Sequence, residues 1–129
     1  RERAALEALA AGLPVRFLGF RTDAKDFYQA FDLFVSPSRS EPLGRVLFEA
    51  LDAGVPVLAT RTQGPSEILA RYPGHLVPVE DVAALAAALR QLATAPPPRR
   101  VHDLSPYPLE NVRRATAAAY RELIAARAR

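Results

Sequence analysis

Glu41 and Glu49, two carboxylates with seven residues between them, are the side chains of this sequence best suited to chemistry. A proline and Gly44 lie between them, and the residues after Gly44 predict a helix. The apolar run at residues 33–35 comes just before and is typical of a buried strand. A strand, a loop, a glycine and a helix N-terminus in this order form a common phosphate-binding device of α/β proteins. Because a carboxylate on each side of it can bind sugar or ribose hydroxyls, the stretch predicts a nucleotide-sugar site.

The predicted helix start offers backbone donors to an anion. The amides of Gly44, Arg45 and Val46 would be unpaired at its first turn, with the helix dipole behind them. Gly44 has no side chain, so a diphosphate can approach the backbone closely. Glu49 lies more than one turn along the helix, and its side chain is expected to lean back toward the loop. The alternatives are ordinary structural roles: a turn for Gly44, an exposed helix glutamate for Glu49 and a loop cap for Glu41.

The elements around these residues alternate between short apolar strands and amphipathic helices. This order predicts parallel crossovers and an α/β fold, a Rossmann-like parallel sheet with helices on both faces. We expect strands over residues 15–20, 33–36, 56–60 and 76–79, and helices over 1–11, 24–31, 44–53, 65–70, 80–93 and 109–128. A turn at residues 62–64 should follow the third strand and face the same crevice as the glutamates.

The chain is predicted to divide into three parts. Residues 1–95 contain all the alternating elements and form the binding domain. Three consecutive prolines at 96–98 end its last helix, so residues 96–108 are predicted to be a proline-rich linker. Residues 109–129 are predicted to form a C-terminal helix with an apolar stripe along one side.

Composition argues against several other classes of protein. The 129 residues suffice for one domain with a core, and the absence of cysteine excludes disulfides and thiolate metal sites. No run approaches the ~20 apolar residues of a membrane span. His75 and His102 have no partner ligands at metal-binding spacing, so we expect structural roles for both and no metal. The arginine pairs at 99–100 and 113–114 lack interleaved aromatic residues, so contact with anionic lipid headgroups is a better expectation than nucleic-acid binding.

Residues 41–60 also resemble a known family. Their sequence contains Glu-Pro-Leu-Gly-Arg-Val-Leu-Phe-Glu-Ala, followed after a short interval by Ala-Gly-Val-Pro-Val-Leu-Ala-Thr. This pattern resembles the donor-binding signature of retaining glycosyltransferases of family 4, the glycosyl transferases group 1. Segments at 17–20, 66–69, 76–78 and 81–85 extend the similarity over residues 1–95. The resemblance implies the C-terminal, donor-binding domain of the two-domain GT-B fold.

The resemblance implies roles for individual residues near the predicted helix. The family residue that matches Glu49 binds the ribose of the donor. The one that matches Glu41 contacts the transferred sugar and helps its charged transition state, which makes Glu41 the candidate catalytic residue. The backbone of the segment Leu43-Gly44-Arg45-Val46 is the candidate binding site for the donor's diphosphate.

The loop after the predicted strand at 15–19 lies beside the nucleobase in the family, so Phe20 and Arg21 are candidates for that contact. Packing against the core is an equal alternative for Phe20. The resemblance implies no cofactor; the donor substrate would be a nucleoside-diphosphate sugar. Members also carry an arginine and a lysine in an early segment of this domain and a separate N-terminal acceptor-binding domain. Neither is found in this sequence, so we expect a truncated piece of an enzyme that is inactive alone.

The implied activity is transfer of a sugar, with retention, from a nucleoside diphosphate to a sugar or lipid-linked acceptor. The segment Glu-Pro-Leu-Gly-Arg resembles members that build bacterial cell-envelope polysaccharides. The expected location is the cytoplasm, with peripheral contact at the inner face of the membrane. Two alternatives from other classes stay open: a non-catalytic nucleotide- or protein-binding module, and a nucleotide-sugar epimerase or phosphorylase of the same fold.

Overall fold

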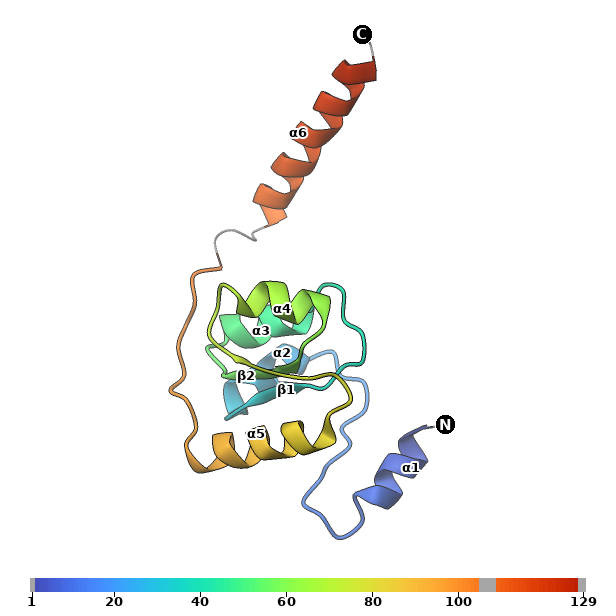
Figure 1. Cartoon of the computed structure of the whole chain (residues 1–129), viewed down its shortest axis with the longest axis vertical. Coiled ribbons are helices and arrows are strands. Elements are labelled where there is room, and N and C mark those ends of the chain that lie inside the picture. Colours follow the sequence, from blue (N-terminus) through green and yellow to red (C-terminus); the bar gives the residue numbers. More distant parts are fainter. Residues whose placement is uncertain (1, 105–108, 128–129) are drawn as a thin grey trace.

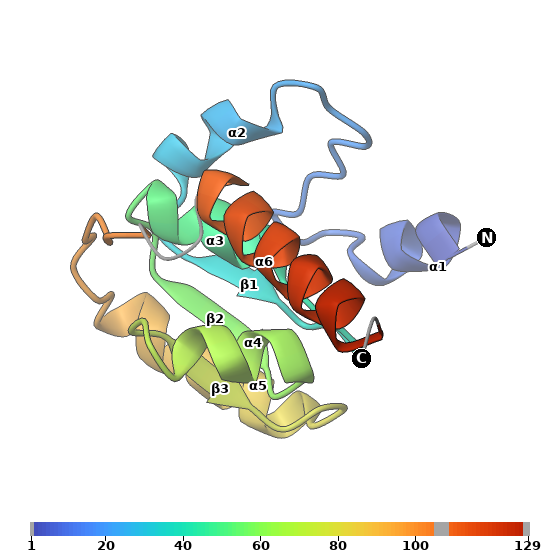
Figure 2. The same cartoon turned by 90° about the horizontal axis from the view of Figure 1, so that it is seen from above.

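The computed structural model describes residues 2–104 and 109–127 of the chain (Figure 1). At its centre is a sheet of three parallel strands, β1 (Phe34–Ser36), β2 (Val57–Thr60) and β3 (His75–Val77), which lie side by side in that order (Figure 2). Val35 pairs with Leu58 across one ladder, and Leu58 pairs with His75 across the other. The strands predicted at 33–36, 56–60 and 76–79 are therefore confirmed, with small shifts at their ends.

Helices cover both faces of this sheet, as the sequence predicted. Helices α3 (Arg45–Asp52) and α4 (Gln63–Leu69) lie on one face, and α5 (Val82–Thr94) lies on the other (Figure 1). The central strand is buried on both sides: Val57 packs toward α3 and α4, whereas Leu58 packs toward α5. Successive side chains of a strand point to opposite faces, so a strand between two helical layers must be apolar throughout.

Local signals set the ends of these helices. Helix α3 begins after Gly44, and Gly54 follows its C-cap; both glycines have the left-handed backbone conformation. The Asp81 carboxylate accepts a hydrogen bond of 2.8 Å from the Ala84 amide and caps the start of α5. Helix α4 begins at Gln63, so the turn predicted at 62–64 is wrong in part: Gln63 and Gly64 belong to the first helical turn.

The strand predicted at 15–20 is also wrong. After helix α1 (Glu2–Leu9) these residues form no ladder, and all of them are exposed. A strand is stabilised by a neighbour, and within the described residues the segment makes one backbone hydrogen bond, from the Val15 amide to the Leu13 carbonyl. The single helix predicted at 24–31 is a short α2 (Ala24–Phe27) that tightens into the 3-10 turn η1 (Tyr28–Ala30).

Residues 96–104, the described part of the predicted linker, contain no helix or strand but lie against the core. The Arg100 amide donates a hydrogen bond of 3.1 Å to the Gly54 carbonyl, and Leu104 packs against the cluster around α3. We call residues 96–104 the strap; residues 105–108 lie outside the described residues. Helix α6 (Leu109–Arg127) then points away from the sheet with Tyr120, Leu123 and Ile124 exposed (Figure 1).

Candidate functional site

The three strands end at one edge of the sheet, and a pocket of 290 Å³ opens there. Its lining comes from the loops that follow β1, β2 and β3: Arg39, Ser40, Glu41, Pro42, Arg61, Thr62, Gln63 and Val79. Ligands of open α/β sheets bind outside the carboxyl ends of the strands. The predicted catalytic candidate Glu41 therefore lies where the topology favours binding.

The Glu41 side chain folds back onto its own loop. Its Oε1 accepts a hydrogen bond of 2.7 Å from the Gly44 amide and a longer one of 3.2 Å from the Leu43 amide. The prediction that the Gly44 amide is unpaired is therefore wrong in this structure, because an intramolecular carboxylate already occupies it. The second oxygen, Oε2, accepts no hydrogen bond from the residues that the structure describes. One oxygen thus orders the loop and the other is available to a ligand.

The next two amides behave as predicted. Arg45 and Val46 form the first turn of α3, and their amides donate to no acceptor in the described parts of the chain. Unpaired amides at a helix N-terminus point along the axis and carry the positive end of its dipole. Leu43 and Val46 are themselves exposed, so this end of α3 is open to solvent. The arrangement can hold an anion beside the Glu41 loop.

Gly64 brings α4 against this loop. Its amide donates a hydrogen bond of 2.9 Å to the Glu41 carbonyl. A Cβ atom at Gly64 would lie only 2.5 Å from the carbonyl carbon of Leu43. The close approach requires glycine, because backbone atoms cannot move aside as a flexible side chain can. The sequence signal for this role was present, a glycine one residue before Pro65 at a helix start, but it was interpreted as a turn.

Glu49 lies on α3 and is half-buried against η1. The Tyr28 hydroxyl donates a hydrogen bond of 3.1 Å to Glu49 Oε2 and lies 3.4 Å from the Val46 carbonyl oxygen. The carboxylate therefore leans back over the turn that precedes its own Cα, as the geometry of helical side chains predicted. Burial, then the charge of Glu49 and the hydrogen bond to it, raise the pKa of Tyr28 to about 12. The hydroxyl is accordingly a donor at any physiological pH.

Phe20 and Arg21, the nucleobase candidates, lie before α2. Phe20 is 94% exposed, so the structure does not support the alternative in which it packs into the core. Arg21 forms an ion pair of 2.6 Å with Asp23, which raises the pKa of Arg21 and lowers that of Asp23. Its guanidinium carbon also lies 4.9 Å from the centre of the Phe27 ring. A hollow of 220 Å³ beside this arginine reaches Tyr28 and so approaches the Glu49 side of η1.

Two arginines at the carboxyl edge were missed by sequence reasoning, and Thr62 belongs to the turn that was predicted to face this crevice. Arg39 forms an exposed ion pair of 3.1 Å with Glu80, whereas the Arg61 guanidinium has no acceptor among the described residues. The Thr62 hydroxyl is buried, with no hydrogen-bond partner in the described part of the chain. Each follows a strand end, and that position was the available signal. In residues 2–104 and 109–127 no three His, Cys, Asp or Glu side chains gather as a metal site would require.

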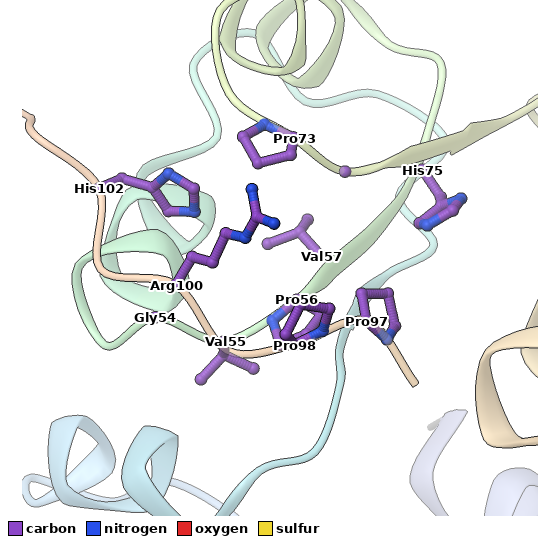
Figure 3. Close-up of a pocket in the computed structure, with 11 residues that line it drawn as sticks. Gly54, Val55, Pro56, Val57, Pro73, His75, Pro97, Pro98, Arg100 and His102 are labelled. Carbon is purple, nitrogen blue, oxygen red and sulfur yellow. The ribbon is translucent and has the colours of Figure 1, made fainter. Parts of the chain in front are cut away.

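The opposite edge of the sheet has a second cavity, of 130 Å³, closed by the strap (Figure 3). Val57 and His75, the first residues of β2 and β3, line it together with Pro97 and Pro98. The Arg100 side chain reaches between Pro73 and Val57 (Figure 3). The His102 ring packs edge-on against Tyr72 with centroids 5.8 Å apart, a structural contact of the kind predicted for this histidine.

Comparison with known proteins identifies the family of the chain. Residues 1–95 match the family model of the glycosyl transferases group 1. The lipopolysaccharide core biosynthesis glycosyltransferase LpsD of Rhizobium meliloti (strain 1021) is 43% identical over 74% of this chain, and the match covers 29% of its own length. The lipopolysaccharide core biosynthesis mannosyltransferase LpsB of the same strain is 34% identical over 96% of this chain and 38% of its own.

A solved structure extends the likeness to three dimensions. Sucrose-phosphate synthase from Thermosynechococcus elongatus superposes with a TM-score of 0.79 and 29% identity over 97% of this chain, which corresponds to 35% of that protein. The chain thus spans about a third of the length of each of these relatives. No helix in the described part of the chain combines the length and apolar character that crossing a membrane requires. With its parallel sheet, its paired glutamates and these matches, the chain belongs to the glycosyl transferases group 1 family of GT-B glycosyltransferases.

Proposed function

We propose that this chain is the donor-binding part of a retaining glycosyltransferase that takes its sugar from a nucleoside diphosphate. The observation that carries the proposal is the order of groups along one connection, from the end of β1 into α3. Glu41 and two unpaired amides follow one another there, at the edge of the sheet where ligands of this topology bind, and Glu49 lies one turn further along α3. That order suits a sugar, a diphosphate and a ribose.

The diphosphate is assigned to the start of α3. Breaking the anomeric carbon–oxygen bond leaves extra negative charge on the diphosphate, and donors fixed in place before the reaction stabilise that charge most effectively. The amides of Arg45 and Val46 are such donors, and the backbone of Leu43 and Gly44 completes the approach. Arg61 lines the same pocket without an acidic partner among the described residues and supplies a positive charge to the diphosphate.

The two glutamates are assigned to different parts of the donor, Glu49 to the ribose and Glu41 to the transferred sugar. Glu49 accepts hydrogen bonds from the ribose hydroxyls, and the loop with Phe20 and Arg21 contacts the base. Glu41 lies beside the transferred sugar: Oε1 keeps the loop in place, while Oε2 faces the developing positive charge of the sugar ring. No step in this assignment uses a metal or a cofactor.

The acceptor is proposed to be a growing saccharide or a lipid-linked sugar. Two relatives are lipopolysaccharide core biosynthesis enzymes by name, and cell-envelope assembly is therefore the proposed context. A separate domain would supply the acceptor site, because the chain spans 29% of the length of LpsD. The protein is placed in the cytoplasm, where the arginines of α6 can touch an anionic membrane face.

The proposal is tested first on the natural protein that contains this chain. Glu41→Ala and Glu49→Ala should each reduce transfer from the preferred nucleotide sugar about 100-fold or more, since each removes a contact to the donor. Glu7→Ala, which breaks only an exposed pair with Arg3 on α1, is the matched control. Wild-type turnover in both site variants would contradict the proposal.

Product analysis separates the alternatives. A glycoside with the anomeric configuration of the donor supports retaining transfer, an inverted one rejects retention, and an epimerised nucleotide sugar identifies an epimerase. Release of a sugar phosphate identifies a phosphorylase. A protein that binds nucleotide but yields no product is a binding module.

A second measurement uses the chain alone. On addition of UDP, GDP or ADP, the backbone NMR signals of Arg45 and Val46 should shift, while those of Ala84 and Leu85 at the capped start of α5 should stay unchanged. Equal shifts at both helix starts would mean that the nucleotide finds helix N-termini in general and not the proposed site.

A further inference from the structure

Tyr28 is held more firmly than its neighbours in η1. The residue is 6% exposed, and its ring contacts Phe31 edge-on and Phe34 at a tilt, each with centroids 5.6 Å apart. Two aromatic contacts leave the ring little freedom to rotate or slide. Only the Tyr28 hydroxyl projects beyond this aromatic cluster, and it donates a hydrogen bond to the Glu49 carboxylate. A buried aromatic body with a polar tip is suited to fixing another polar group.

Arg99 of the strap holds the backbone of η1, the turn that contains Tyr28, through hydrogen bonds. Its guanidinium donates to four backbone carbonyls, those of Tyr28 and Ala53 at 3.1 Å, Gln29 at 2.9 Å and Phe31 at 3.1 Å. Three of these carbonyls belong to η1 and its C-cap, and Ala53 is the C-cap of α3. A cation at two helix ends donates to their terminal carbonyls and complements the helix dipoles. One side chain therefore sets the spacing between η1 and α3.

We infer that Tyr28 is a positioning residue that orients Glu49 toward two vicinal hydroxyls of the ligand, and that Arg99 maintains the spacing this requires. The inference rests on the proposed function, in which Glu49 binds the ribose. Tyr28 holds Oε2 at 3.1 Å, and Oε1 accepts no hydrogen bond from the described residues. The carboxylate is accessible, because it lines a cavity of 220 Å³ with Lys25, Gln29 and Asp52.

Fixing one oxygen has a consequence for specificity. A glutamate on a helix surface can adopt several rotamers, and ordering it costs free energy each time a ligand binds. Tyr28 orders Glu49 in advance, so the ribose hydroxyls meet an acceptor already in place. Loss of the Tyr28 hydroxyl should therefore weaken only ligands that possess those hydroxyls. A general structural role would weaken all ligands alike.

The decisive comparison is between a nucleoside diphosphate and its 2′,3′-dideoxy form. Of UDP, GDP and ADP, the one that binds the chain most tightly is used. The unmodified chain should bind the ribose form about 10-fold more tightly than the dideoxy form, and Tyr28→Phe should reduce this ratio to about 3-fold or less. The dideoxy Kd should not change. Tyr72→Phe, which removes a hydroxyl that donates to the Asp103 carbonyl, is the matched control and should keep the ratio.

Each outcome has a distinct meaning. Equal weakening of both ligands by Tyr28→Phe would overturn the positioning role and leave the proposed function intact. A ratio near one in the unmodified chain, or a ratio unchanged by Glu49→Gln, would overturn the ribose role of Glu49 and with it the proposed function.

A ligand-free measurement tests the contact itself. In NMR titrations of tyrosine-labelled chain, the pKa of Tyr28 should lie at about 12 and fall in Glu49→Gln, because the negative charge that helps to raise it is lost. The role of Arg99 is tested by the ligand ratio: Arg99→Ala should lower the preference for the ribose form over the dideoxy form, because η1 loosens. Arg100→Ala should leave this ratio unchanged. A Tyr28 that titrates like free tyrosine would overturn the inference, and an Arg99→Ala variant with an unaltered ratio would overturn the role of Arg99.

Discussion

The two edges of the sheet use the same short strands in opposite ways. At the amino edge, the strap covers the strand starts, and Arg99 alone satisfies four backbone carbonyls. At the carboxyl edge, the amides of Arg45 and Val46 and the buried Thr62 hydroxyl have no partner among the described residues. Native proteins satisfy nearly all their buried polar groups, so the buried Thr62 hydroxyl is an exception, whereas the two amides are left to solvent at the start of a helix. The contrast indicates that one edge is built for stability and the other is kept ready for a ligand.

Among substitutions at the two edges of the sheet, those of glycine should change the free energy of unfolding most. Gly64→Ala should lower the free energy of unfolding by about 3 kcal/mol, because its Cβ would lie 2.5 Å from the Leu43 carbonyl carbon at the carboxyl edge. Gly54→Ala at the amino edge would place a Cβ 3.2 Å from the backbone of Arg100 and would also strain a left-handed residue, so it should cost at least about 1–2 kcal/mol. Urea unfolding measures both.

Gly12→Ala is the control for these substitutions. Gly12 is left-handed too, but a Cβ added there would meet nothing within 4 Å, so only backbone strain of about 1–2 kcal/mol remains. A Gly64→Ala chain no less stable than Gly12→Ala would show that the loop at the carboxyl edge can move away from α4.

The amino edge can be weakened by one side chain. Arg99→Ala should lower the free energy of unfolding by about 2 kcal/mol, since the carbonyls of two helix ends lose a charged donor. Arg100→Ala removes the same charge from the neighbouring residue, whose side chain makes no hydrogen bond with the described residues, and should change stability by less than about 0.5 kcal/mol. Thermal unfolding of the two variants side by side separates the effect of the contacts from that of net charge. Equal losses would assign the effect to charge.

The smallest effect has the opposite sign. Thr62→Val keeps the shape of the side chain but removes an unsatisfied hydroxyl, so it should raise the free energy of unfolding by about 1 kcal/mol. Thr60→Val, two residues earlier, removes a hydroxyl that donates to the Ser38 carbonyl, and it should lower stability by a similar amount. Chemical denaturation resolves the difference in sign. Destabilisation by both substitutions would mean that Thr62 has a partner after all, such as a bound water.

Sequence alone predicted what depends on periodicity and on spacing along the chain. The alternating elements and the helix after Gly44 follow from local geometry, whereas Glu49 contacts Tyr28 of η1, a partner that no local signal marks. The same logic failed at residues 15–20, where an apolar run meets no neighbouring strand. Periodicity describes a segment and not its partners, so it cannot tell whether a strand has one.

The contacts that shape the candidate site lie beyond such signals. Arg99 binds the Tyr28 carbonyl across 71 positions of sequence, and the Tyr28 hydroxyl reaches Glu49 across 21. No pattern in a single sequence marks such pairs. The occupied amide of Gly44 corresponds to the loop cap that the sequence left open as an alternative for Glu41: a carboxylate three residues earlier can cap a helix or bind a sugar, and its residue type fits both roles.

The contact of Gly64 with Leu43 limits how far the loop at the carboxyl edge can move. Loop and helix touch through backbone atoms, and α4 is anchored by Ile68, which is 3% exposed in the core. Drawing the loop over a bound molecule would pull that anchor out of the apolar interior. The loop therefore acts as a rigid template and not as a closing flap. In the proposed site, donors with different bases would be accommodated by segments free of the core, such as the one that ends at the solvent-facing ring of Phe20.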